Sequence, residues 1–170
     1  DKPLRIADIG TGGGFPLLVI ASLLPKSQCI GLDSTKKKVD AVERIVKSCE
    51  LKNVSLVCGR TEELGHQKDL RESFDIVTAR AVAPIATLLE YAAPLLKVCG
   101  TAVFWKSMHI AEELAASAKA TSVLRMRSLV PFTYTLPKDF GTRQLLLYRK
   151  EGVTPVLYPR AIGVPKQDPL

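Results

Sequence analysis

The chain has 170 residues, of which 46% are hydrophobic and 24% are charged. This length and composition predict one compact domain with a buried core, and they leave no room for a second catalytic domain. The longest apolar stretch, residues 15–24, is interrupted by Pro16 and Ser22. A membrane-spanning helix needs roughly 20 apolar residues, so we expect a soluble protein without a membrane partner.

The net charge of +7 is concentrated in the last third of the chain. Residues 121–170 carry 8 basic and 3 acidic side chains and so contribute +5 of the total. A polyanionic partner such as a nucleic acid explains this excess. A solvated basic surface that only keeps the protein in solution explains the charge alone equally well.

Histidines and cysteines are scattered along the sequence. His66 and His109 are isolated from each other and from every cysteine, which excludes zinc and most metal-hydrolase sites, so we expect no metal. No C-x-x-C pair is present. We expect the four cysteines to be buried, reduced thiols in a reducing compartment: Cys29, Cys49, Cys58 and Cys99.

Short strand-like runs alternate with helical patterns over the first 106 residues. The strand-like runs predict five strands: Leu4–Ile9, Gln28–Leu32, Val54–Cys58, Phe74–Thr78 and Thr101–Lys106. Three helices are predicted between them: Phe15–Leu24, Thr35–Leu51 and Pro84–Lys97. Ser34 should cap the second helix, and Gly100 should follow the third. This rhythm favours right-handed crossovers between parallel strands, which gives an α/β fold with a doubly wound sheet.

The pattern changes after residue 110. Ile110–Ala120 has helical spacing, and Ser122–Tyr134 and Thr142–Arg149 predict two further strands, antiparallel and at one edge of a seven-stranded, mostly parallel sheet. Four prolines between residues 155 and 169 argue against helix or central strand. We therefore expect a domain over residues 1–150 and an extended, Pro-rich basic tail over residues 151–170.

The sharpest local signal is Asp8-Ile9-Gly10-Thr11-Gly12-Gly13-Gly14-Phe15, between the first strand and the first helix. Glycines at alternate positions allow a tight turn and close approach of a ligand to the main chain. A dinucleotide site has G-x-G-x-x-G spacing for a diphosphate, whereas this run has G-x-G-x-G. The shorter turn favours a ligand without a diphosphate, such as S-adenosylmethionine. A purely structural turn is the alternative.

Acidic residues follow the next two strands. Asp33 ends the second strand, 19 positions beyond Gly14, where a carboxylate can accept both ribose hydroxyls of an adenosine. Capping of the next helix is an alternative role compatible with this one. After the third strand, Thr61 and Glu62 offer main-chain groups and a carboxylate for an adenine edge, unless Glu62 simply begins a helix.

Basic residues follow the two strands after those. Arg80 comes directly after a strand that should lie centrally, and Lys106 has the equivalent place on the next strand. The carboxyl ends of parallel strands share one rim, so both side chains should stand over the crevice beside the glycine turn. A surface arginine is the usual alternative for Arg80.

The rim lacks an evident general base apart from Asp33. Methyl transfer to an alcohol or a carbon usually requires a base, whereas a ring nitrogen with a free lone pair, such as N7 of guanine, needs no deprotonation. The methylated purine becomes cationic. We therefore expect Arg80, Lys106 and Arg143 to bind phosphate or O6 rather than N7.

These residues together resemble one known family, the bacterial small-subunit ribosomal RNA guanine-N7 methyltransferases, also called glucose-inhibited division protein B. The matching segments are Asp8 to Pro16, Asp33-Ser34, Arg60-Thr61-Glu62-Glu63, Thr78-Ala79-Arg80-Ala81-Val82-Ala83, Pro94-Leu95-Leu96-Lys97 and the tail from Tyr158-Pro159-Arg160 to Leu170. The likeness covers essentially the whole sequence, and the segment around Arg80 is its most specific part.

The resemblance implies a class I methyltransferase fold and methyl transfer from S-adenosylmethionine to N7 of one guanine in the decoding-region loop of 16S ribosomal RNA. It implies catalytic roles for Arg80 and Lys106. Donor-binding roles are implied for Asp8, Gly10, Gly12, Gly14, Phe15, Asp33, Ser34, Thr61, Glu62 and Arg80, and RNA-binding roles for Arg80, Lys106, Arg143 and Arg160. We also expect a monomer that acts on ribosomal RNA or the ribosomal subunit, in the bacterial cytoplasm or a plastid stroma.

Departures from the family pattern keep other interpretations open. Leu17, Cys99 and Ser107 stand where members usually have glycine. Members also carry a helical N-terminal segment ahead of the position that corresponds to Asp1, so we expect looser donor binding or poorer folding. A methyltransferase for a small molecule or a protein is the main alternative. A catalytically silent RNA-binding homologue, favoured by Ser107, and a nicotinamide-dependent oxidoreductase are the others.

Overall fold

The computed structural model describes residues 2–170, which form one eight-stranded sheet flanked by helices. The strands are β1 (Arg5–Ile9), β2 (Gln28–Asp33), β3 (Val54–Cys58), β4 (Phe74–Arg80), β5 (Leu96–Lys106), β6 (Met126–Ser128), β7 (Phe132–Thr135) and β8 (Thr142–Lys150). The helices are α1 (Leu17–Leu23), α2 (Lys36–Ser48), α3 (Thr61–Leu64), α4 (Ile85–Ala92), α5 (Ala111–Ala116), α6 (Ala118–Val123) and α7 (Val164–Gln167).

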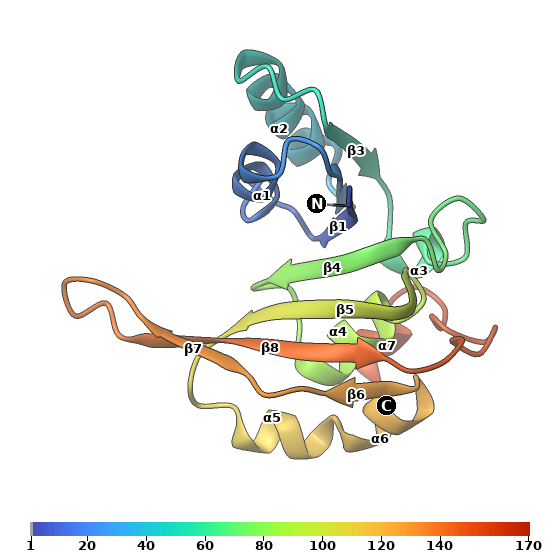
Figure 1. Ribbon diagram of the computed structural model, residues 1–170. Coiled ribbons are helices and arrows are strands. Elements are labelled where there is room, and N and C mark those ends of the chain that lie inside the picture. The colour runs from blue at the N-terminus through green and yellow to red at the C-terminus, as the bar shows by residue number, and fades with distance from the viewer. Residues whose placement is uncertain (1) are drawn as a thin grey trace.

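The sheet order is β3-β2-β1-β4-β5-β8-β6, with β7 also paired to β8. Strands β1 to β5 are parallel to one another, and β8 runs antiparallel to β5. Figure 1 shows α1 and α2 beside the β1–β3 half of the sheet and α4, α5, α6 and α7 beside the other half. The doubly wound, mostly parallel sheet expected from the strand–helix rhythm is confirmed.

The segment predicted as one strand over residues 122–134 is two short strands. Both β6 and β7 pair with the edge of β8 that β5 does not occupy. Pro131 lies between them and has no N–H to donate to the ladder. The sheet therefore has eight strands in seven lateral positions. Residues 122 and 123 belong instead to α6.

The helix predicted to run from Pro84 to Lys97 is shorter than its apolar pattern. It ends at Ala92, two residues before Pro94, and β5 begins at Leu96. Proline lacks the N–H that would continue the helical hydrogen bonds. Gly100 consequently lies inside β5 rather than after a helix.

Cysteine burial was predicted wrongly for three of the four residues. Cys29 is buried in β2, but Cys49, Cys58 and Cys99 are exposed, and all four are free thiols. Cys49 follows the last turn of α2, and Cys58 ends the edge strand β3. An apolar sequence context therefore did not imply burial at the ends of these elements.

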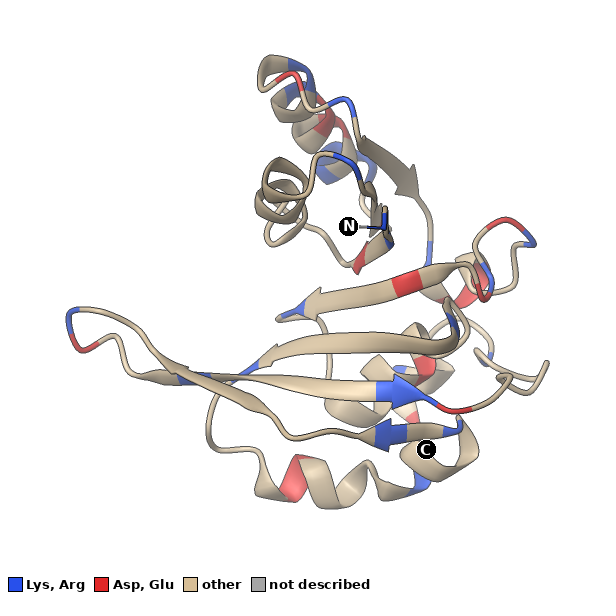
Figure 2. Cartoon of the chain, in the orientation of Figure 1, with Lys and Arg blue, Asp and Glu red and all other residues tan. Residues whose placement is uncertain are grey.

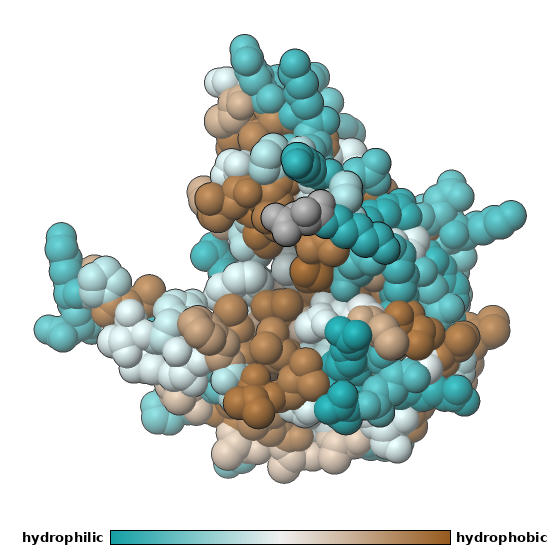
Figure 3. All heavy atoms as spheres, viewed as in Figure 1, coloured by the Kyte–Doolittle hydropathy of each residue, from teal (hydrophilic) through white to brown (hydrophobic). Residues whose placement is uncertain are grey.

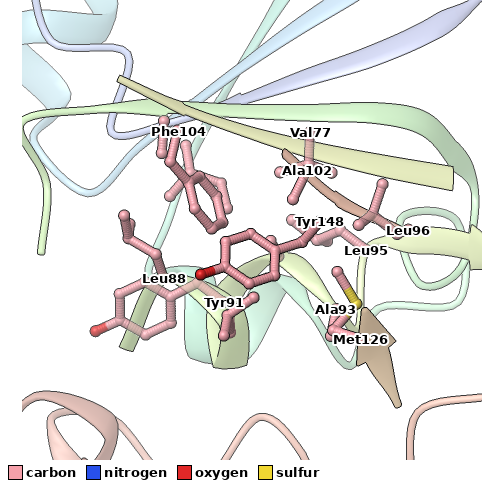
Figure 4. Packing of buried hydrophobic residues seen from close by; sticks show 14 of the residues in the cluster. Val77, Leu88, Tyr91, Ala93, Leu95, Leu96, Ala102, Phe104, Met126 and Tyr148 are labelled. Atoms are coloured by element: carbon pink, nitrogen blue, oxygen red, sulfur yellow. The ribbon is translucent and has the colours of Figure 1, made fainter. Parts of the chain in front are cut away.

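The main core lies between α4 and one face of the sheet. Phe104 of β5 and Tyr148 of β8 have ring centroids 5.9 Å apart, and Figure 4 shows these rings beside Leu88 and Tyr91 of α4. The opposite face of this half of the sheet is less covered: Val103, Trp105, Leu145 and Leu147 are only half-buried. Figure 3 shows apolar side chains gathered on the side of the molecule where β4, β5 and β8 lie in Figure 1.

Residues 154–168, here called the C-terminal strap, fold back onto the body. The Arg71 guanidinium donates to the carbonyls of Thr154, Pro155 and Tyr158. Helix α7 lies within this segment, although an extended tail was predicted. Proline is tolerated in the first turn of a helix, because that turn has no internal partners for its N–H groups, and Pro165 occupies such a place.

Within residues 2–170, no helix combines the length and the apolar character that crossing a bilayer requires.

Candidate functional site

A cleft of about 400 Å³ opens at the carboxyl ends of β1, β2 and β3. This volume falls in the range typical of small-molecule sites. The lining comes from the loops after four strands, from helices α2, α3 and α4, and from the strap: Ile9, Gly10, Leu32, Asp33, Ser34, Thr35, Lys38, Gly59, Arg60, Thr61, Glu62, Ala81, Val82, Ala83, Tyr91 and Lys166. Residues predicted from widely separated motifs thus meet at one place, as the shared rim of a parallel sheet requires.

The glycine turn follows β1 with left-handed backbone at Gly10 (φ 62°), Gly12 (φ 55°) and Gly14 (φ 91°). A Cβ on Gly10 would lie 2.7 Å from Val82 Cγ2, and one on Gly14 would lie 2.6 Å from Leu18 Cδ1. A side chain at either position would therefore strain the backbone and collide with a neighbour.

Asp33 connects this turn to the loop after β2. Its Oδ2 accepts the main-chain N–H of Gly12 at 2.9 Å, and its Oδ1 accepts that of Thr35 at 2.9 Å. The side chain is 7% exposed and lines the cleft. Ser34 was predicted to cap the following helix, but Thr35 is the N-cap residue. Ser34 instead lines the cleft.

Asp8 lies at the end of β1, just before the glycine turn, and is buried. Burial raises the pKa of this carboxyl to about 6, although a hydrogen bond from the Thr78 hydroxyl opposes the shift. Asp8 Oδ2 and Thr11 Oγ1 are buried with no hydrogen-bond partner among residues 2–170. Both atoms are closed off from solvent, and neither residue lines the cleft.

Glu62 is the second residue of α3, as the helix-start alternative anticipated, and it also lines the cleft. Its Oε1 accepts the Tyr91 hydroxyl at 3.2 Å and the main-chain N–H of Gly163 at 3.0 Å. Burial and the neighbouring Glu62 raise the pKa of Tyr91 to about 12, so its O–H remains a donor. Thr61 is the first residue of α3 and lines the cleft too.

Arg80 ends β4 with an exposed side chain. Its positive charge lowers the pKa of Asp8, against the larger effect of burial. Within the described part of the chain, no ion pair or side-chain hydrogen bond holds its guanidinium. The following loop, which includes Ala81 at φ 57°, lines the cleft. Arg80 is therefore a free cation at the rim.

Lys106 ends β5, as predicted, but its side chain is paired within the protein. Its ammonium donates to the carbonyl of Ala83 at 2.9 Å and pairs with Glu113 at 2.8 Å. The side chain is 15% exposed. These contacts join the loop after β4 to α5, so Lys106 supports the rim rather than standing free over it.

Arg160, predicted to bind RNA, is engaged inside the protein. Its guanidinium donates to both carboxylate oxygens of Glu90, which is fully buried. This buried pair anchors the strap to α4 and occupies the guanidinium, and the RNA-binding role expected for Arg160 stays a prediction.

Arg143 and Phe15 lie away from the cleft lining. Arg143 is exposed on the β7–β8 hairpin, which projects from the body in Figure 1, and Figure 2 shows basic and acidic residues at the tip of this hairpin. Phe15 follows the glycine turn and is 52% exposed.

Among the lining residues that the sequence did not assign to the site are three polar ones from α2, α4 and the strap: Lys38, Tyr91 and Lys166. Lys38 could have been found, because it lies in the first turn of the helix after Asp33. Tyr91 and Lys166 carry no local signal, since only folding brings α4 and the strap to the cleft. Residues 2–170 contain no cluster of three His, Cys, Asp or Glu side chains arranged to hold a metal.

The family model for "rRNA small subunit methyltransferase G" matches residues 1–136. The chain belongs to this family. Relatives named ribosomal RNA small subunit methyltransferase G include the proteins of Carboxydothermus hydrogenoformans, with 41% identity over 98% of this chain and 71% of the relative, and Syntrophomonas wolfei, with 37% identity over 99% and 78%. The protein of Synechococcus elongatus shares 39% identity over 98% of this chain and 69% of its own length.

Solved structures with the same fold share little sequence with this chain. A SAM-dependent methyltransferase from Methanosarcina mazei superimposes with a TM-score of 0.68 at 12% identity, over 89% of this chain and 94% of that one. One from Aquifex aeolicus gives 0.62 at 15% identity, over 85% and 81%. These likenesses confirm the class I methyltransferase fold for this member of the family.

Proposed function

We propose that this protein transfers a methyl group from S-adenosylmethionine to N7 of a guanine in the decoding-region loop of small-subunit ribosomal RNA. Membership of the methyltransferase G family is the observation that carries the proposal. The relatives are bacterial, so we place the reaction in the bacterial cytoplasm. We further propose that the enzyme is a monomer and that its partner is ribosomal RNA or the ribosomal subunit.

The cleft residues fit the proposed methyl donor. Asp33 presents a carboxylate whose two oxygens each have a lone pair beyond the one used by Gly12 or Thr35, so it can accept ribose hydroxyls. Glu62 and Thr61 border the same cleft at the end of β3, which suits the purine. Gly10 of the glycine turn lines this cleft as well, and the amino-acid end of the donor would bind beside that turn.

When bound, S-adenosylmethionine supplies a methyl group on a sulfonium, which is already activated toward a nucleophile. The chain then has to orient the acceptor and exclude water. The two carboxylates that line the cleft, Asp33 and Glu62, both hold main-chain N–H groups and are poorly placed to take up a proton. This arrangement favours an acceptor that needs no deprotonation, such as N7 of guanine.

We assign Arg80 to the RNA or donor at the rim, because its guanidinium is exposed and unpaired within residues 2–170. Arg143 is an exposed cation on the hairpin and is proposed as a phosphate contact. Lys106 is proposed as a positioning residue that acts through Ala83 and Glu113.

Radiolabelled S-adenosylmethionine tests the proposal directly. The protein is incubated in parallel with small ribosomal subunits, deproteinised ribosomal RNA, free nucleosides and a protein mixture. Label in the small-subunit RNA of either of the first two reactions supports the proposal. Label only in nucleosides or protein would favour the alternative, a methyltransferase for small molecules or proteins, and binding of NAD in place of S-adenosylmethionine by calorimetry would overturn the methyltransferase assignment.

A further inference from the structure

The C-terminal strap is held on the body by contacts with buried or partly buried groups. Besides the Arg71 contacts, His66 Nε2 lies 2.7 Å from the Pro159 carbonyl, and the Thr87 hydroxyl donates to the Pro165 carbonyl at 2.8 Å. The Arg160–Glu90 pair adds a bidentate contact to a fully buried carboxylate. The path of the strap is therefore fixed from its start to helix α7.

These anchors bring the strap to the edge of the cleft. The N–H of Gly163, at φ 83°, donates to Glu62 Oε1. Lys166, three residues further on, lines the cleft together with Asp33, Thr61 and Glu62. The strap thus fixes one carboxylate of the cleft and adds one ammonium group to it.

We propose that the C-terminal strap is part of the donor site, and that Lys166 with Glu62 recognises the purine edge of its adenosine. This inference rests on the proposed function. Adenine presents an amino donor on C6 beside the acceptor N1, and proteins read a base through that edge with an acceptor and a donor side by side.

Glu62 can supply the acceptor for the amino group, and Lys166 can supply the donor for N1. Glu62 Oε1 is used by Tyr91 and Gly163, whereas Oε2 accepts no hydrogen bond within residues 2–170 and is available for the amino group. The exposed Lys166 side chain has three N–H donors and no internal partner in the described residues, so it can donate to N1.

Calorimetry with S-adenosylhomocysteine and S-inosylhomocysteine tests this assignment. The inosine analogue replaces the amino donor by a carbonyl and the acceptor N1 by N–H, so it mismatches both groups. We expect wild-type protein to prefer the adenosine compound. Lys166→Gln should bind it about tenfold more weakly, as loss of a charged donor predicts, with a reduced preference over the inosine compound. Gln167→Ala, on the same exposed helix, is the matched control.

The outcomes separate the two proposals. Failure of the wild-type protein to bind either S-adenosylmethionine or S-adenosylhomocysteine would overturn the proposed function. Binding by the wild type, with affinity and base preference unchanged in Lys166→Gln, would overturn only the role of the strap.

Hydrogen–deuterium exchange supplies a readout independent of any substitution. Because linkage is reciprocal, a ligand that contacts the strap must also stabilise it. We expect S-adenosylhomocysteine to slow exchange of the amides around Gly163, whereas unchanged exchange there on the saturated protein would contradict the inference.

Discussion

Asp33 accepts the main-chain N–H of Gly12 at 2.9 Å, a contact that joins the loops after β2 and β1. The carboxylate therefore fixes the glycine turn while it borders the cleft. A change at this one side chain should therefore alter both the glycine turn and the wall of the cleft.

Asp33→Asn should weaken binding of S-adenosylhomocysteine by about 10- to 100-fold, because hydrogen bonds to a charged group contribute about 1.5–3 kcal/mol. Calorimetry measures the change. Asp40→Asn removes a carboxylate on the exposed side of α2, where it pairs with Lys36, and should leave the dissociation constant unchanged. Equal affinities for Asp33→Asn and wild type would rule out a ribose contact.

Arg80→Ala should abolish methylation of ribosomal RNA and change donor affinity much less, because the free guanidinium stands at the rim. A filter assay for labelled RNA, with calorimetry on the same preparation, separates the two effects. Lys119→Ala removes an exposed cation from α6 and serves as the control for net charge. An unaffected methylation rate in Arg80→Ala rejects the assignment.

Lys106 and Glu113 should behave as a coupled pair. Lys106→Ala leaves the Glu113 carboxylate, 27% exposed, without its cation, so it should slow methylation and lower stability. The double variant with Glu113→Ala should recover part of both losses, because it leaves no unpaired charge. A double variant as impaired as Lys106→Ala would point instead to direct RNA contact by the lysine.

Asp8 should make stability depend on pH. Burial raises its pKa from 3.8 to about 6, so the folded state holds the proton more tightly than the unfolded state. The stability that this tighter proton binding gives the folded state is fully present below pH 3.8 and is lost as the pH rises through 6.

The free energy of unfolding of Asp8→Asn, relative to that of the wild type, should therefore rise by about 2 kcal/mol between pH 4.5 and pH 7.5, because one pKa unit corresponds to about 1.4 kcal/mol. Urea unfolding at both pH values gives this difference. Asp69→Asn, at an exposed position, should show no comparable trend. A pH-independent difference for Asp8→Asn would exclude the buried, protonated carboxyl.

Cys99→Gly should stabilise the protein by about 0.5–1 kcal/mol, because a non-glycine residue with left-handed backbone is strained. Cys99 has φ 67° and is exposed, so no packing is lost. Cys49→Gly is the matched control: Cys49 is also exposed but has φ −90°, so glycine there should lower the urea midpoint. A decrease for both variants would show that Cys99 is unstrained.

The five parallel strands and the position of the cleft followed from the sequence. Strand periodicity and the Asp8–Phe15 turn are local signals, and the rule that strand ends share a rim placed Asp33 and Glu62 together. The ion-pair partners of Lys106 and Arg160 were not predicted. Glu113 is seven residues from Lys106 and Glu90 is 70 residues from Arg160. Neither spacing marks a pair in the sequence, because each pair forms only when α5 or α4 takes its place in the folded chain.

The path of the C-terminal strap also depends on contacts that the sequence does not indicate. Its prolines indicated an extended tail, yet the Arg71 and Glu90 contacts, which span 70 or more residues, decide its path. Long-range pairing also brings Lys166 to the cleft, where no sequence motif marks it. Local sequence patterns predicted the helices and strands. Contacts between polar groups far apart in the sequence decided which side chains remain free for a ligand.

The central claim is most directly tested by mapping the modified base. Small ribosomal subunits that lack the modification are treated with the protein and S-adenosylmethionine, and the RNA is then reduced with borohydride and cleaved with aniline, which breaks the chain at N7-methylguanine. The account predicts one new cleavage, in the decoding-region loop, that is absent with Arg80→Ala. Methyl incorporation without cleavage, or cleavage at many guanines, would contradict it.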